Sequence, residues 1–265
     1  MRITPADLRI VRRGGLLVRF AALGPVAYVV AELDEAGSAG TALEAACVNP
    51  HWGLVVVGEL MVERGDEPAT HIAAGEAFHV RAGAPEHRFT APGRLAVVGF
   101  APLEPRTIDD ADIEQAGFEL VQEAEVIPSL TPSLGVSVAL PSDVLPVRRG
   151  QIEASASLMG PWVCCAARFG GVSGYTSAWC DLPHWGTVVH GTIAIEWEDS
   201  VEIISAGDAF YCPAGPPGHR IEVTDAATIL DFTPVEAMTH AGRVAEWRPR
   251  IAIAEPETTI AVGDR

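Results

Sequence analysis

The chain has 265 residues, of which 48% are hydrophobic and 20% charged, and its formal net charge is −17. This composition is typical of a globular protein, and the acidic balance argues against a nucleic-acid partner, which requires a basic surface. No apolar run reaches the roughly 18 residues that a membrane-spanning helix requires. The first residues lack the apolar core of a signal peptide, so we expect a cytoplasmic protein with reduced cysteines and no membrane partner.

The first half of the chain is predicted to consist of short strands. Residues 54–57 form an apolar run that ends at Gly58, and residues 58–63 follow at hairpin distance with alternating apolar and polar side chains. Residues 75–78 are typical of a turn that leads into a strand, and residues 83–85 of a turn. Short strands at a spacing of roughly 8–12 residues indicate a sandwich or a barrel.

A connector follows, from about residue 103 to residue 145. Acidic residues at the start of the segment 109–117 favour a short helix, because negative charge stabilises the first turn of a helix. Several prolines then indicate a linker or edge-strand region. The last residues, from about 255, are expected to form a mobile tail.

The second half of the chain repeats the first. The β-rich pattern returns over residues 187–190, 192–197 and 207–210. The offset between the two copies changes by only a few residues, as loop insertions would change it, which indicates a tandem duplication. The most distinctive shared residues are Cys47, Pro50, His51, Trp52, Gly53, Gly58 and His87, which recur as Cys180, Pro183, His184, Trp185, Gly186, Gly191 and His219.

These residues resemble the two motifs of the cupin superfamily, and their duplication resembles a bicupin. The spacing from His51 to Gly58, repeated from His184 to Gly191, matches the end of the first motif, and the second motif is matched by Gly207, Pro213 and Gly215. The resemblance implies an all-β fold of two tandem jelly-roll-like barrels, joined by a linker with a short helix. The implied domains are residues 1–104 and 141–250, with a linker over 105–140 and a tail over 251–265.

The resemblance also implies a changed set of metal ligands. Cupins usually supply three histidines and one glutamate. In this chain His51 and His184 stand at the position of the glutamate, and Cys47 and Cys180 at the position of the second histidine. The first histidine is replaced by alanine in both copies. The implied ligands are therefore Cys47, His51 and His87 in one barrel, and Cys180, His184 and His219 in the other.

The spacing of these residues is compatible with a metal site. Cys47 and His51 are four residues apart, so a regular strand would place both side chains on one face, and Cys180 and His184 share this spacing. Three such ligands with one open position are typical of catalytic zinc, and they also suit iron, whereas magnesium and calcium are disfavoured. Cysteine and histidine packed in the core as ordinary buried residues are the alternative interpretation.

Neighbouring positions suggest further roles. Gly53 and Gly186 continue the inward alternation, so we expect space for a ligand beside each histidine. Trp52 and Trp185 point the other way and are predicted to pack between sheets or at an interface. His190 is predicted to face inward near a strand end, where it is the candidate general base for catalysis, with a role at the barrel mouth or an interface as the alternative.

Three functions are compatible with this ligand set. The first is an enzyme that uses a divalent transition metal on a small organic molecule, dioxygenase-like with iron, and a lyase, isomerase or hydrolase with zinc. The second is a non-catalytic protein that binds a small ligand or senses redox state through a zinc-bound thiolate. The third is a structural bicupin with vestigial sites. We expect the first, with a small-molecule substrate and a monomeric or homodimeric chain.

Overall fold

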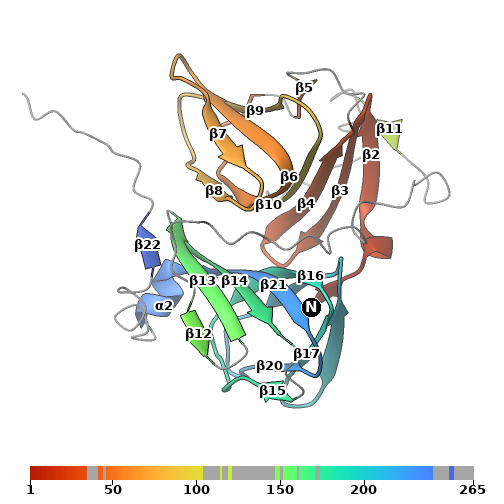
Figure 1. Cartoon of the computed structure of the whole chain (residues 1–265), viewed down its shortest axis with the longest axis vertical. Helices are drawn as coiled ribbons and strands as arrows, with labels where there is room; N and C mark the ends of the chain where they lie inside the picture. Colours follow the sequence, from red (N-terminus) through yellow and green to blue (C-terminus); the bar gives the residue numbers. More distant parts are fainter. Residues whose placement is uncertain are drawn as a thin grey trace, which may run out of the picture.

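The structure, a computed structural model, describes residues 1–34, 41–43, 46–103, 114, 119–120, 147–149, 152–159, 161–170, 174–240 and 251–253. The fold is all β and consists of two cupin-like barrels, as predicted (Figure 1). The described part of the chain also contains two short helical segments with defined bounds. They are a 3₁₀ helix, Pro5–Asp7, and the helix α2, Val235–His240. No helix in that part is both long enough and apolar enough to cross a bilayer.

The first barrel is built around one long strand, β6, which spans His51–Arg64. Its first half pairs with β10 and β8, and its second half with β7 and β9. Residues 54–57 and 58–63 therefore belong to a single strand, and the prediction that Gly58 ends a strand is wrong in this copy. The other strands are β2 (Arg9–Arg13), β3 (Leu16–Leu23), β4 (Val26–Leu33), β5 (Thr41–Ala42), β7 (Thr70–Ala73), β8 (Ala77–Val80), β9 (His87–Ala91), β10 (Leu95–Pro102) and β11 (Glu119–Leu120).

The second barrel contains two sheets. In this copy Gly191 does separate two strands, β16 and β17, as predicted. One sheet has the order β1 (Arg2–Ile3), β19 (Ala209–Cys212), β16 (His184–His190), β21 (Ala227–Pro234), β14 (Trp162–Phe169), β13 (Ile152–Met159) and β12 (Val147–Arg149), with β22 (Ile251–Ile253) beside β13. The other has the order β15 (Tyr175–Thr176), β20 (Arg220–Val223), β17 (Thr192–Glu196) and β18 (Val201–Ser205).

Some strands pair outside the domain, linker or tail to which the sequence assigned them. The N-terminal strand β1 pairs with β19 of the second barrel. The segments predicted as linker and tail each supply a strand, since β11 pairs with β2 and β22 with β13. The helix predicted over residues 109–117 lies outside the described residues except for Glu114, which is helical. The mobile tail predicted from about residue 255 also lies outside them.

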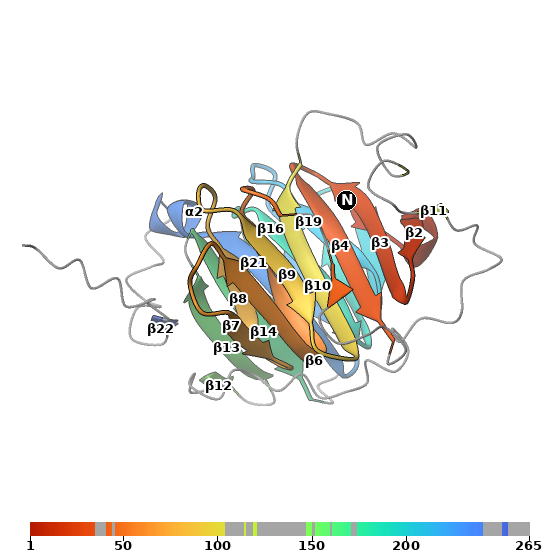
Figure 2. The same cartoon turned by 90° about the horizontal axis from the view of Figure 1, so that it is seen from above.

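Among the described residues, three apolar clusters hold the fold together. One fills each barrel, and the third lies between the barrels, where strands of the first lie across strands of the second (Figure 2). Alternation along the strands divides the side chains between these clusters. In β10, for example, Leu95 and Val97 point into the first barrel, whereas Val98 and Phe100 point toward the second.

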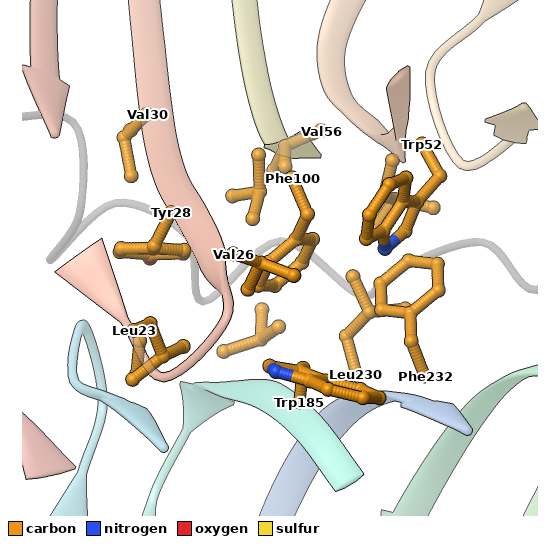
Figure 3. Packing of buried hydrophobic residues seen from close by; sticks show 14 of the residues in the cluster. Leu23, Val26, Tyr28, Val30, Trp52, Val56, Phe100, Trp185, Leu230 and Phe232 are labelled. Carbon is orange, nitrogen blue, oxygen red and sulfur yellow. The ribbon is translucent and has the colours of Figure 1, made fainter. Parts of the chain in front are cut away.

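The cluster between the barrels is rich in aromatic side chains. Trp52 and Phe100 of the first barrel face Trp185 and Phe232 of the second (Figure 3). Trp162 stacks on Trp52 with ring centroids 4.3 Å apart. The prediction that Trp52 and Trp185 pack between sheets is confirmed. Because each tryptophan directly follows a candidate ligand histidine, the same strand end builds both the site and the contact between the barrels.

Candidate metal centres

The first cluster of candidate ligands comprises Cys47, His51 and His87. Their ligand atoms all lie within 4.8 Å of one another. The Cys47 Sγ is 3.1 Å from the His51 Nε2 and 3.3 Å from the His87 Nε2. His87 is fully buried, whereas the other two are partly exposed.

The second cluster repeats the first. The ligand atoms of Cys180, His184 and His219 also lie within 4.8 Å of one another. The Cys180 Sγ is 3.3 Å from the His184 Nε2, and the rings of His184 and His219 meet edge to face. The structure therefore brings together the three predicted residues of each copy.

Backbone pairing explains why the residues converge. An isolated antiparallel bridge joins Cys47 to His87, with each amide 2.9 Å from the carbonyl oxygen of the other. The same bridge joins Cys180 to His219. Residues 48–50 are outside any strand, and β6 begins at His51. Cys47 and His51 are therefore not part of one regular strand, as the spacing had predicted, and the bridge between Cys47 and His87 brings the candidate ligands together instead.

The glycines beside the histidines do not leave space for a ligand, contrary to the prediction. A Cβ atom on Gly53 would lie 2.2 Å from the Val98 carbonyl oxygen and 2.9 Å from the Phe78 ring. On Gly186 it would lie 2.3 Å from the Phe210 ring. These glycines admit a neighbouring strand and an aromatic ring, so they are packing positions.

The arrangement of the donor atoms fits a metal ion. Metal–ligand bonds of roughly 2.0–2.3 Å in a tetrahedral site place sulfur and nitrogen about 3.5 Å apart, close to the separations found here. Burial, together with the charge of the neighbouring histidine in each cluster, lowers the pKa of His51 and of His219 to about 4. Burial and the charge of Arg64 also lower the pKa of His87. These imidazoles are neutral at neutral pH, as metal ligands must be.

His184 has a different environment, which the sequence did not predict. Its Nδ1 lies 3.0 Å from the Asp231 Oδ2 and 2.9 Å from the Thr233 Oγ1. Burial would lower the pKa of His184, but the charge of Asp231 and its hydrogen bond outweigh burial and raise the pKa to about 10. The contact with Asp231 at Nδ1 leaves the Nε2 of His184 on the side of Cys180.

A sequence signal for Asp231 does exist. The strand β21 is apolar around it, and an acid in such a strand requires a partner. The first copy has Gly99 at the equivalent position, one residue before Phe100, as Asp231 is one residue before Phe232. Asp231 can therefore be identified from the sequence as a position where the two copies differ, and not from the residues that they share.

His190 lies outside the second cluster. It is exposed at the end of β16, and the pairing of β16 with β21 shifts register between Val188 and His190. This irregularity breaks the alternation from which an inward position was predicted. The general-base role assigned to it therefore has no support from the geometry.

Comparison with solved structures supports the cupin-type fold. AerE from Microcystis aeruginosa is 9% identical, with a TM-score of 0.56 over 86% of this chain and 98% of that chain. The oxalate decarboxylase of Lactobacillus farciminis is 15% identical, with a TM-score of 0.62 over 88% and 86% of the two chains. That of Bacillus subtilis, which has Mn(II) centres, is 13% identical, with a TM-score of 0.61 over 88% and 77%. No protein-family model and no curated protein matches the sequence.

Proposed function

We propose that the protein is a metal-dependent enzyme that acts on a small organic molecule at a Cys-His-His site inside one or both barrels. The observation that carries the proposal is the convergence of one thiol and two imidazoles at the same place in each copy. Three protein ligands leave a coordination position open, which is the arrangement of catalytic rather than structural sites.

The donor set narrows the choice of metal. A thiolate with two imidazoles favours zinc or iron, whereas manganese prefers oxygen ligands. The manganese of the Bacillus subtilis neighbour is therefore not carried over to this chain, and neither is oxalate as its substrate. A bound zinc would supply a Lewis acid, suited to a lyase, isomerase or hydrolase, and a bound iron would supply a redox centre, suited to a dioxygenase-like reaction.

The chain's own residues have two tasks in this proposal. Cys47 and Cys180 would hold the metal as thiolates, together with the buried histidines His87 and His219. Aromatic side chains such as Phe89 and Trp197 pack against these histidines, with ring centroids 5.4 Å away in both cases. They limit the access of water to the metal, which strengthens electrostatic interactions with a bound substrate.

A second candidate function is a non-catalytic zinc-dependent redox sensor. It is favoured by the partial exposure of Cys47 and Cys180, because an oxidant must reach a thiolate to react with it. Metal-dependent turnover of a small molecule distinguishes the enzyme from the sensor. Loss of metal on mild oxidation, without any turnover, would favour the sensor.

Metal analysis of the purified protein tests the proposal. We expect stoichiometric zinc or iron, and we expect His51→Ala and His184→Ala each to lose the metal of their own barrel. His71→Ala is the matched control, because His71 is an exposed histidine paired with Glu59 and lies outside both clusters. A protein that carries no stoichiometric metal and binds no added Zn(II) or Fe(II) would overturn the proposal.

A further inference from the structure

The interiors of the two barrels differ in polarity at several positions that occupy the same register. Gly99 pairs with Val29 and Gly53 in the first barrel, as Asp231 pairs with Cys165 and Gly186 in the second. The alternation of β10 and β21 directs these positions into the barrels. The first barrel therefore has Val29, Gly99 and Ala101 where the second has Cys165, Asp231 and Thr233.

Two of these residues of the second barrel, Asp231 and Thr233, contact the same candidate ligand, His184. Asp231 and Thr233 are two residues apart on β21, so both side chains are on the inner face, and both reach the His184 Nδ1. The other ring nitrogen of His184 faces the Cys180 Sγ. Asp231 is largely buried, and its strand is held on both sides by β14 and β16. The carboxylate therefore fixes both the orientation of the ring and the nitrogen that faces the metal position.

We infer that Asp231 makes the second barrel the tighter of the two metal sites. This inference rests on the proposed function and extends it, because it assigns unequal affinities to sites with the same three ligands. A carboxylate that accepts a hydrogen bond from a ligand histidine orients the ring and strengthens it as a donor, and removal of such a partner weakens metal binding by about 10–100-fold.

Charge gives a second reason for the difference. In the second barrel, the Cys180 thiolate and the Asp231 carboxylate together neutralise a divalent cation. In the first barrel, the residues at the positions of Asp231 and Thr233 are Gly99 and Ala101, which have no polar side-chain atoms. At these positions the second barrel therefore supplies a negative charge near a divalent ion that the first barrel does not supply.

Zinc titration of single-site proteins tests the inference. A His51→Ala chain retains the second site and a His184→Ala chain retains the first, and a chromophoric chelator that competes for Zn(II) gives the dissociation constant of each at a fixed neutral pH. We expect the second site to bind more tightly. Adding Asp231→Asn to the His51→Ala chain should raise its dissociation constant by about 10–100-fold.

The reciprocal substitution keeps the test informative if Asp231→Asn disturbs the fold. A Cβ atom on Gly99 would meet only the Trp52 carbonyl oxygen, at 3.8 Å, so the first barrel has room for the start of a side chain there. Gly99→Asp in the His184→Ala chain should tighten zinc binding at the first site, whereas Gly99→Ala should leave it unchanged. Circular dichroism of the metal-free proteins verifies that each variant is folded.

The outcomes are distinct. Equal zinc affinities in the two single-site chains, or an unchanged affinity after Asp231→Asn, would overturn this inference while the proposed function stands. Failure of the unsubstituted protein to bind either Zn(II) or Fe(II) in any barrel would overturn both. Substitution of Co(II) for zinc supplies a second measurement, because its absorption spectrum reports ligand geometry. We expect the Asp231→Asn variant to alter that spectrum only at the second site.

Discussion

Gly53 and Gly186 show how much a single methyl group can matter in this fold. Each glycine lies two residues after a candidate ligand histidine, on the strand that begins with that histidine. Each is packed against a neighbouring strand and a phenylalanine ring. Replacing Gly53 with alanine places a Cβ atom 2.2 Å from the Val98 carbonyl oxygen, which the sheet can relieve only by separating its strands. We expect Gly53→Ala to lower the free energy of unfolding by about 1–3 kcal/mol.

Urea unfolding of the metal-free protein measures this effect. Gly99→Ala is the matched control, since Gly99 lies on the paired strand and its nearest neighbour would be 3.8 Å away. We expect that variant to be as stable as the unsubstituted protein or slightly more stable, because alanine restricts the unfolded chain. Equal losses in the two variants would show that packing beside Gly53 is not the cause.

The sequence allowed the two clusters of candidate ligands to be predicted, but not the residue that distinguishes one cluster from the other. Comparison of the two copies retains what they share, and therefore finds Cys47, His51 and His87 together with their counterparts. Asp231 has no counterpart, since its equivalent is Gly99, so the comparison passes over it. Its contact with His184 depends on how β21 pairs with β16, and spacing along the sequence does not determine that pairing.

At the scale of elements, the β3–β4 pair contains an ion pair that sequence reasoning also missed. Arg19 on β3 and Glu32 on β4 are paired through the Arg19 Nη1, and both are buried, with exposed fractions of 5% and 8%. We expect Arg19→Ala to lower the free energy of unfolding by about 3–5 kcal/mol, because it leaves the Glu32 charge buried without its partner.

A double variant distinguishes two effects on stability, which are the loss of the ion pair and the burial of an unpaired Glu32 charge. We expect Arg19→Met with Glu32→Leu to recover most of the stability, because apolar residues of similar volume carry no buried charge. Thermal unfolding of the two variants side by side makes the comparison. A double variant as unstable as Arg19→Ala would contradict the explanation from an unpaired charge.

Element boundaries were predictable only where local residues decide them. Gly58 and Gly191 both have positive φ, of 80° and 76°, yet β6 continues through the first while β16 ends before the second. The continuation depends on pairing with β7 and β9 rather than on the glycine itself. The register shift near His190 could not be predicted from local residues either, because it depends on how β16 pairs with the neighbouring strand β21.

At the scale of the whole molecule, Tyr28 links the two barrels. Its hydroxyl is 3.3 Å from the Thr187 Oγ1 of the second barrel. Burial raises the pKa of Tyr28 to about 12, from an ordinary value of 10, although the hydrogen bond to Thr187 opposes the change. The folded protein thus retains the Tyr28 proton at a pH at which the unfolded chain releases it.

This linkage gives a pH dependence with a definite sign. The contribution of Tyr28 is complete below pH 10 and decreases as the pH rises through about 12, by roughly 3 kcal/mol in all at about 1.36 kcal/mol per pH unit. Urea unfolding between these limits should show a steeper loss of stability for the unsubstituted protein than for Tyr28→Phe. Parallel profiles for the two proteins would refute the linkage.

The position of β1 has a consequence for how the chain is made. Arg2 pairs through its guanidinium with Asp208, 206 positions later, and β1 forms the edge of a sheet whose other strands come from residues 147–253. During synthesis β1 leaves the ribosome well before its partner β19, which lies about two hundred residues later in the chain. Until then, the backbone groups of β1 that pair with β19 have no partner strand, and such open edges invite association with other chains. Contacts over so long a sequence separation also form slowly. Newly made chains should therefore be prone to association through β1 until β19 is available to pair with it.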